Sequence, residues 1–195
     1  MKHLLILFIA AVLASVMTFR TSPARLQDFS REKEAPSRVL QGAIAYINTR
    51  PVYRSRYYAG GWPDDGCGTC TDLAGFALLS CGYDLREKVH ADILLHRERY
   101  AIEEPDINID FRRVRNLIPY FQYNAIVLTN DLSEQEEWQG GDLVLFRNHI
   151  GVVSDRRNPR GTPYVIHHYG PFQMRYEEDI LETRNDLVLH VRVLP

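Results

Sequence analysis

Cys70 stands in a sequence context that favours a reactive thiol. It lies within Thr69-Cys70-Thr71-Asp72, which fits a capping box: the Thr69 side chain can accept from the backbone N–H of residue 72, and Asp72 can reach back. Cys70 would then be the first residue of a helix, where free N–H groups and the helix dipole favour a thiolate. The sequence therefore predicts a nucleophile with a lowered pKa, beside N–H groups able to hold an oxyanion. The alternative is a small buried residue in a packed helix.

Two of the seven histidines fall on runs that predict neighbouring β-strands. His149 begins the run 149–153, and His167 ends the run 164–167 beyond a turn-rich stretch. A turn centred on residue 158 puts His149 opposite His167 on one face of a hairpin and turns His168 to the other face. Two imidazoles that close can hydrogen-bond, one orienting the other. The alternative is a chance polar pair on a solvated face.

The same residue types allow other chemistry. Cys67 and Cys70 form a C-x-x-C at a helix start, as in thiol redox proteins, but no strand–helix–strand frame precedes it. The two cysteines and two histidines are suitable zinc ligands without a tight local spacing. The run 106–110 begins like a calcium loop but lacks its glycine and closing glutamate. We expect neither a metal nor a cofactor, and a Cys67–Cys81 disulfide would explain the odd cysteine count.

The periodicity of apolar residues predicts helices first and strands after. The expected helices are 38–50, one from Cys70 to a break at Gly82, and shorter pieces near 86–97 and 113–122. The expected strands are 142–146, 149–154, 164–168 and 187–193. This order predicts an α+β domain in which the cysteine helix packs on a small antiparallel sheet.

Length and composition limit the classes of protein to consider. The chain has 195 residues, of which 45% are apolar and 25% charged, so it is not a disordered or collagen-like chain. The formal net charge of −2 shows no basic excess, so a nucleic-acid partner is not expected. The length suits one domain, which we place at residues 38–195 and expect to be a monomer.

The first residues resemble a secretory leader. Lys2 precedes an apolar run over 4–19 that Arg20 ends, and this run is short for a bilayer span. Residues 1–24 are expected to be a cleaved signal peptide or an N-terminal membrane anchor, with a buried helix as the third reading. Residues 25–37 are expected to be a polar linker. The body is therefore predicted to be exported, to a bacterial periplasm or cell envelope.

Short motifs occur in one order along residues 38–195. They are Tyr58-Ala-Gly-Gly, Cys70-Thr-Asp, Gly141-Asp-Leu-Val-Leu-Phe146, His149-Ile-Gly-Val-Val and Val165-Ile-His167. Their order resembles the NlpC/p60-type cysteine hydrolases, a papain-like superfamily of bacterial cell-wall enzymes. Within it the chain is most similar to domain-of-unknown-function family 1287, above all over residues 105–117.

The resemblance implies a papain-like fold with Cys70 as nucleophile, His149 as base and His167 as the residue that orients it. The expected reaction is cleavage of an amide bond in peptidoglycan stem peptides. Tyr58 is a candidate oxyanion donor, and Arg112 and Arg113 could bind substrate carboxylates. Two alternatives remain open: a binding module of the cell envelope on the same fold, and a thiol acyltransferase or lipid esterase.

Overall fold

The computed structural model describes residues 23–194, and the side chains of residues 36–194. The α-helices are α1 (Pro23–Asn48), α2 (Cys70–Leu79), α3 (Leu85–Leu95) and α4 (Val114–Asn124). Short 3-10 turns are η1 (Arg97–Arg99), η2 (Asp110–Arg112) and η3 (Gln135–Glu137). The strands are β1 (Val52–Tyr53), β2 (Cys67–Gly68), β3 (Ile126–Leu128), β4 (Leu143–Phe146), β5 (His149–Arg157), β6 (Pro163–Ile166), β7 (Glu177–Glu178) and β8 (Leu187–Arg192).

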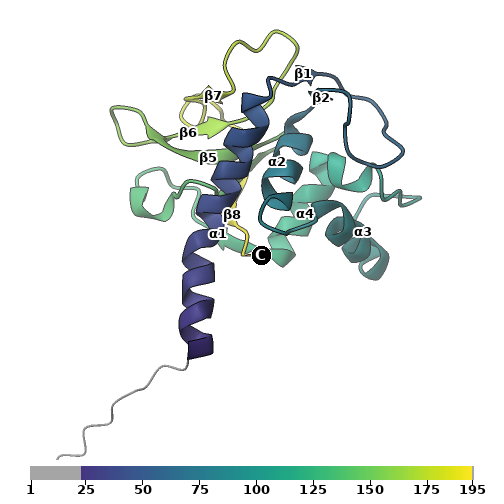
Figure 1. The fold of residues 1–195 in the computed structure, drawn as a ribbon, viewed down its shortest axis with the longest axis horizontal. Helices are drawn as coiled ribbons and strands as arrows, with labels where there is room; N and C mark the ends of the chain where they lie inside the picture. The colour runs from purple at the N-terminus through teal and green to yellow at the C-terminus, as the bar shows by residue number, and fades with distance from the viewer. Residues whose placement is uncertain (1–22, 195) are drawn as a thin grey trace, which may run out of the picture.

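Six of the strands form one antiparallel sheet in the order β3-β8-β4-β5-β6-β7. Helices α1, α2 and α4 lie beside this sheet, with α3 beyond them (Figure 1). The short strands β1 and β2 pair in parallel next to the start of α2. The prediction of an α+β domain with an antiparallel sheet is confirmed, and the four main predicted strands and four helices are present.

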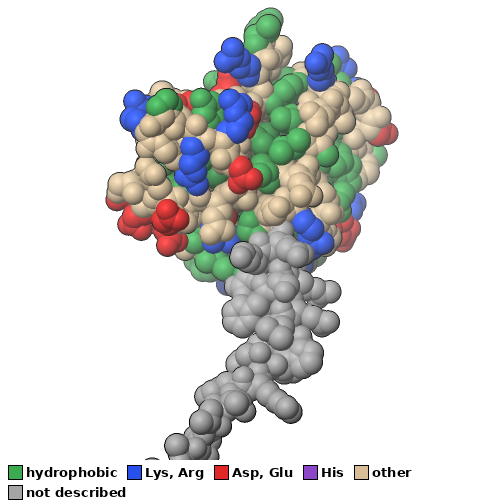
Figure 2. All heavy atoms as spheres, turned by 60° about the vertical axis from the view of Figure 1, so that its left-hand side comes forward, with side chains coloured by type: hydrophobic (Ala, Val, Ile, Leu, Met, Phe, Trp, Pro, Cys, Tyr) green, Lys and Arg blue, Asp and Glu red, His purple; other side chains and the backbone are tan. Residues whose placement is uncertain are grey.

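The centre of the sheet is buried on both faces. Strand β4 is buried along its whole length, which explains why 143–146 is a continuous apolar run rather than an alternating one. Ile150 and Val152 point to the core beneath the helices, while Phe146 and Val153 belong to a second cluster on the opposite face. Figure 2 shows no histidine on the face it presents, in keeping with the burial of the strand histidines.

Helix α1 is longer than predicted. It begins at Pro23 instead of residue 38, so the expected linker at 25–37 is helical, and its first half projects from the body (Figure 1). The segment before Pro36 lacks glycine and is rich in good helix formers, which outweigh the single proline inside the helix. No described helix is long and apolar enough to cross a membrane. All but the last two residues of the leader predicted at 1–24 lie outside the described residues.

A glycine is required where α1 passes the sheet. Gly141 has a φ of +98°, and a Cβ at this position would lie 1.7 Å from the carbonyl oxygen of Pro36. The backbone of the turn before β4 therefore approaches the helix more closely than any side chain would allow. This contact fixes α1 against the start of the strand that leads to His149.

The hairpin of β5 and β6 is shifted from its predicted register. Val152 pairs with Ile166, whereas a turn centred on residue 158 would pair it with residue 164. A bulge between Val153 and Arg157 and a longer turn displace the centre. The shift is an even number of residues, so every side chain keeps its predicted face.

Candidate active site

Cys70 is the first residue of α2, as predicted. The backbone N–H of Thr69 donates to Asp72 Oδ2 at 2.8 Å, and the reciprocal capping interaction is also present. Strand β2 leads into this turn, and α2 ends before Gly82, whose φ is +85°. A local pattern of four residues therefore places the sulfur at the N-terminus of a helix that packs on the sheet.

The expectation of a lowered thiol pKa is wrong. Burial raises the pKa of Cys70 to about 11, and the Asp72 carboxylate acts in the same direction. The backbone N–H groups of Ile150, Thr71 and Cys70 itself oppose this shift. The helix start favours the thiolate as expected, but the desolvation caused by packing α2 against β5 is the larger effect.

His149 and His167 form the predicted pair. Their rings contact through a hydrogen bond of 2.9 Å between His149 Nε2 and His167 Nδ1. The rings of Phe146 and Tyr169 flank His149. Burial lowers the pKa of His149 to about 3, with further contributions from His167 and Arg184, so the imidazole is neutral at neutral pH.

The sulfur lies close to the backbone that carries His149. The N–H of Ile150, the next residue along β5, is near enough to Cys70 to lower its pKa. Within residues 36–194, no hydrogen bond joins Cys70 to either imidazole, and the Nδ1 atom of His149 has no hydrogen-bond partner. The structure thus brings the two histidines into direct contact and places the thiol next to residue 150.

A pocket of about 470 Å³ opens at Cys70. Tyr53, Arg113, Arg115 and Asn148 line it together with the cysteine. Arg113 and Arg115 have no acidic partner among the described side chains, so their charge faces the pocket uncompensated. The cavity therefore combines a thiol with two free cations.

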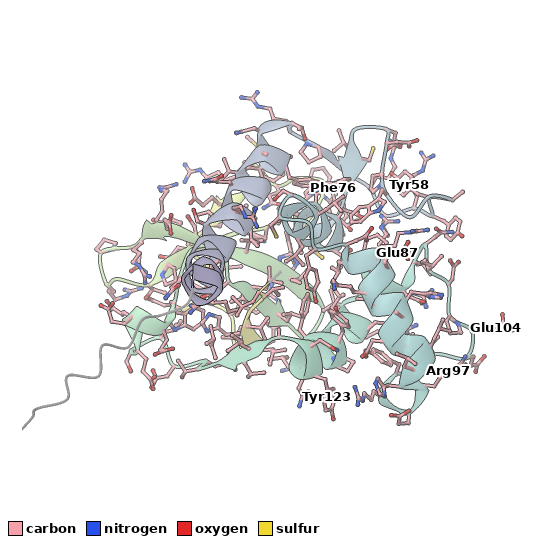
Figure 3. All side chains as sticks on the ribbon, turned by 60° about the horizontal axis from the view of Figure 1, so that its bottom comes forward. Tyr58, Phe76, Glu87, Arg97, Glu104 and Tyr123 are labelled. Carbon is pink, nitrogen blue, oxygen red and sulfur yellow. The ribbon has the colours of Figure 1, made fainter. Side chains whose placement is uncertain are left out.

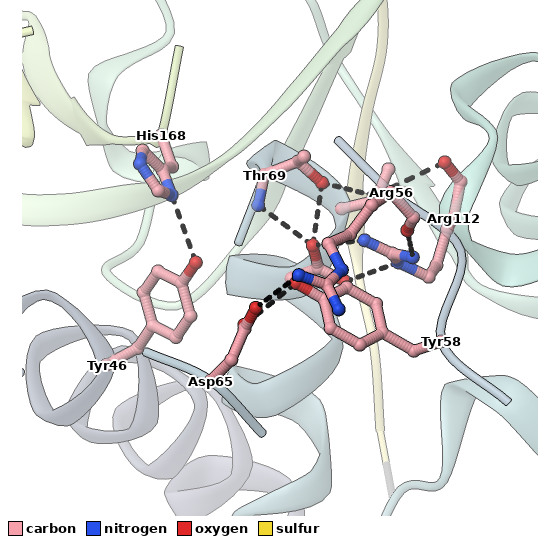
Figure 4. A network of polar contacts seen from close by, with 9 residues as sticks. Tyr46, Arg56, Tyr58, Asp65, Thr69, Arg112 and His168 are labelled. Carbon is pink, nitrogen blue, oxygen red and sulfur yellow. Dashed lines mark hydrogen bonds and ion pairs between the residues drawn. The ribbon is translucent and has the colours of Figure 1, made fainter. Parts of the chain in front are cut away.

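Arg112 is held in a buried ion pair instead of being available to a ligand. Its Nε donates to Asp72 Oδ1 at 2.7 Å and its Nη2 to Asp72 Oδ2 at 2.9 Å, while Nη1 donates to the carbonyl of Arg56 (Figure 4). The Arg112 side chain is 3% exposed. The structure corrects its expected role as a carboxylate ligand, because its charge is already neutralised by the cap of α2.

Tyr58 does not face the thiol. Its hydroxyl donates to Asp65 Oδ1 at 2.9 Å, and the guanidinium groups of Arg56 and Arg112 lie over its ring. Figure 3 places Tyr58 on the side of the molecule formed by α2 and α3. The structure corrects its role as an oxyanion donor: Tyr58 organises the loop before β2, and Tyr53 lines the pocket in its place.

His168 turns to the other face, as predicted, and finds a partner there. Its Nδ1 lies 3.0 Å from the hydroxyl of Tyr46 on α1 (Figure 4), and burial lowers its pKa to about 4. The sequence did not identify Tyr46, Tyr53 or Glu178 as neighbours of the site. Glu178 contacts His167 Nε2 at 2.9 Å from a two-residue strand whose pattern is too short to recognise.

All three cysteines are free, so the Cys67–Cys81 disulfide that would have explained the odd count is absent. Cys81 at the end of α2 donates its thiol to the carbonyl of Leu78 at 3.0 Å, and Cys67 is buried in β2. The odd number of cysteines reflects three separate thiols in three environments.

Comparisons with known proteins identify a family and a relative, but no similar solved structure. A family model described as Domain of unknown function (DUF1287) matches residues 40–193. Uncharacterized protein YijF from Escherichia coli (strain K12) is 37% identical over 141 residues, which are 67% of this chain and 67% of that protein. No solved structure matches.

Proposed function

The chain belongs to the family described as Domain of unknown function (DUF1287), and on this premise we propose that it is an exported cysteine hydrolase of papain-like, NlpC/p60-type fold that cleaves an amide bond in peptidoglycan stem peptides. The observation that carries the proposal is the placement of Cys70 at the first turn of α2, beside the backbone N–H of Ile150, the residue that follows His149 in β5. His167 engages the Nε2 atom of His149, so Nδ1 is the nitrogen that we assign as the base for the thiol.

The proposed reaction begins with a neutral thiol and a neutral imidazole. The Cys70 sulfur attacks the carbonyl carbon while His149 Nδ1 accepts the thiol proton, and the carbonyl π electrons move onto oxygen. The tetrahedral adduct collapses, the C–N bond breaks, and His149 returns the proton to the leaving amine. Water then attacks the thioester with His149 as base, which releases the acid and restores the thiol.

Two donors are suited to the developing oxyanion. The backbone N–H of Cys70 lies at the free N-terminus of α2. Tyr53 lines the same pocket, and its hydroxyl has no hydrogen-bond partner among the described side chains. Tyr53 thereby replaces Tyr58 in the role expected from the sequence.

The charge of the pocket supports an anionic substrate. Arg113 and Arg115 face the cavity without acidic partners, and Asn148 adds an amide. Guanidinium groups bind carboxylates through paired hydrogen bonds. Stem peptides of peptidoglycan carry free carboxylates close to their amide bonds, which fits two cations beside the thiol.

The test is mass spectrometry of purified sacculi after incubation with the wild type, Cys70→Ala and Cys81→Ala. We expect new peptide fragments with the wild type and with Cys81→Ala, whose thiol lies in the core, but none with Cys70→Ala. Identical products from the wild type and Cys70→Ala would contradict a thiol hydrolase and favour an envelope-binding module.

Export is part of the proposal and has its own test. Residues 1–36 fused to alkaline phosphatase, which is active only outside the cytoplasm, should give an active fusion. Replacing apolar residues within 4–19 by charged ones should abolish that activity. A stable but inactive wild-type fusion would contradict export.

A further inference from the structure

We propose that Glu178 is a positioning residue that determines which ring nitrogen of His149 is free to act as the base. The inference rests on the proposed function, because it concerns the proton acceptor for Cys70. It extends the Cys70–His149–His167 arrangement by a carboxylate that the sequence did not reveal.

Glu178 is connected to His149 through a single imidazole. His167 Nε2 lies 2.9 Å from Glu178 Oε2, and His167 Nδ1 lies 2.9 Å from His149 Nε2. The two histidines are 4% and 3% exposed, so water has little access to either ring. In the β6–β7 ladder Glu178 pairs with Val165, which places its side chain on the same face as His167, two residues further along.

The chemistry of these groups fixes which atom donates the proton in each of the two hydrogen bonds. An ionised carboxylate can only accept, so His167 must carry its proton on Nε2. The Nδ1 atom of a neutral His167 then has a lone pair and accepts from His149, which must be protonated on Nε2. A neutral His149 is therefore left with a lone pair on Nδ1, the nitrogen that has no other partner.

The negative charge also favours the intermediate state of the reaction. When His149 accepts the thiol proton it becomes a cation in a buried site, where Arg184 disfavours that charge and Asp186 favours it. Glu178 acts in the opposite direction: burial lowers the pKa of His167, and the carboxylate raises it. Within the proposal, the Glu178 charge, which lies two hydrogen bonds from His149, acts in the same sense on the His149 imidazolium.

Glu177 provides a matched control on the same strand. Its carboxylate accepts from Arg156 Nη1 at 2.5 Å and from the hydroxyl of Ser154, and it does not touch either imidazole. Glu177→Gln removes the same charge from β7 without altering the contact to His167. In Glu178→Gln the amide can donate to His167 Nε2, which would reverse both hydrogen bonds and protonate His149 on Nδ1.

The experiment measures ring protonation by ¹⁵N NMR of histidine-labelled full-length protein, together with the rate of Cys70 alkylation at neutral pH. In the wild type and in Glu177→Gln we expect His149 to be protonated on Nε2 and free on Nδ1. In Glu178→Gln we expect a mixture of the two forms and alkylation and hydrolysis slower by about tenfold. Glu178→Asp, which keeps the charge, should recover the wild-type ring pattern in part.

Equal ring patterns and rates in Glu178→Gln and Glu177→Gln would overturn the inference. If Glu178→Gln fails to fold, the NMR spectrum of the wild type still tests the inference. A proton on Nδ1 of neutral His149 in the wild type would contradict the proposed order of hydrogen bonds from Glu178 through His167 to His149. Absence of peptidoglycan cleavage would contradict the proposed function, while the NMR and alkylation data would still report on Glu178.

Discussion

Arg112 and Asp72 form a bidentate ion pair that connects the turn before α4 to the first turn of the cysteine helix. Asp72 also accepts from the backbone N–H of Thr69, so one carboxylate serves both as helix cap and as partner of a buried cation. Arg112, one of the three arginines that line the thiol pocket, therefore stabilises the helix that carries Cys70.

Removing one member of this pair should destabilise the fold. Arg112→Ala leaves the Asp72 carboxylate buried without its cation, and breaking a buried ion pair typically costs about 3–5 kcal/mol. Arg113→Ala, which breaks no ion pair, should change stability by less than about 0.5 kcal/mol. Urea unfolding of the two variants measures the difference, and equal midpoints would contradict a structural role for Arg112.

The raised pKa of Cys70 predicts a steep pH dependence of alkylation. With a pKa of about 11 the thiolate is a minor species at pH 7, so labelling by iodoacetamide should accelerate about tenfold per pH unit below that value. Cys70 should still react before Cys67 and Cys81, because both of these are buried, with 8% of their surface exposed, whereas Cys70 is half-buried and lines a pocket. Mass spectrometry of labelled peptides measures each rate. An alkylation rate of Cys70 that no longer rises above neutral pH would show that the thiolate is already formed there, which would contradict the raised pKa.

The three histidines near the site should differ in their effect on turnover. His149→Asn removes the base and should cost about 10²–10⁴-fold in rate. His167→Asn keeps a hydrogen-bonding side chain beside His149 and should retain more activity. His168→Asn should change the rate little but lower stability by about 1 kcal/mol through the contact to Tyr46. A larger loss of rate for His168→Asn than for His167→Asn would contradict this assignment.

Tyr53 and Tyr58 provide a second matched pair. Tyr53→Phe removes a hydroxyl from the thiol pocket and should slow hydrolysis by about 10²-fold at unchanged stability. Tyr58→Phe removes the donor to Asp65 and should act mainly on stability, by about 1–2 kcal/mol. Steady-state kinetics and thermal unfolding of both variants separate the roles. The reverse pattern would restore Tyr58 as the oxyanion donor.

Acid should destabilise the protein through its buried histidines. The folded-state pKa of His149 is lowered to about 3 and that of His168 to about 4, so both are neutral when folded and bind protons readily only when unfolded. Their contribution to stability is complete above pH 6.5 and is lost as the pH falls towards these values, by up to about 1.4 kcal/mol per pH unit for each group. Denaturant unfolding between pH 7 and 4 measures this slope, which His168→Asn should reduce. If the slope is the same in His168→Asn as in the wild type, His168 binds protons equally in the folded and unfolded protein, which would contradict its lowered pKa.

The sequence by itself determined those features that depend on residues close together in the chain. The start of α2 at Cys70 follows from a capping box of four residues, and strands β4, β5, β6 and β8 follow from apolar patterning. The common face of His149 and His167 was predictable because side chains alternate with a period of two, so an even shift of register leaves the face unchanged.

Only the tertiary structure decided the properties that depend on distant segments. Packing of α2 against β5 partly removes Cys70 from water and raises its pKa, a desolvation effect with no local signature. Arg112 finds Asp72 forty residues away, and Glu178 reaches His167 from a strand of two residues. Charge and hydrogen-bonding capacity are visible in a sequence, but which partner uses them is settled by the folded chain, because burial makes each unpaired polar group costly.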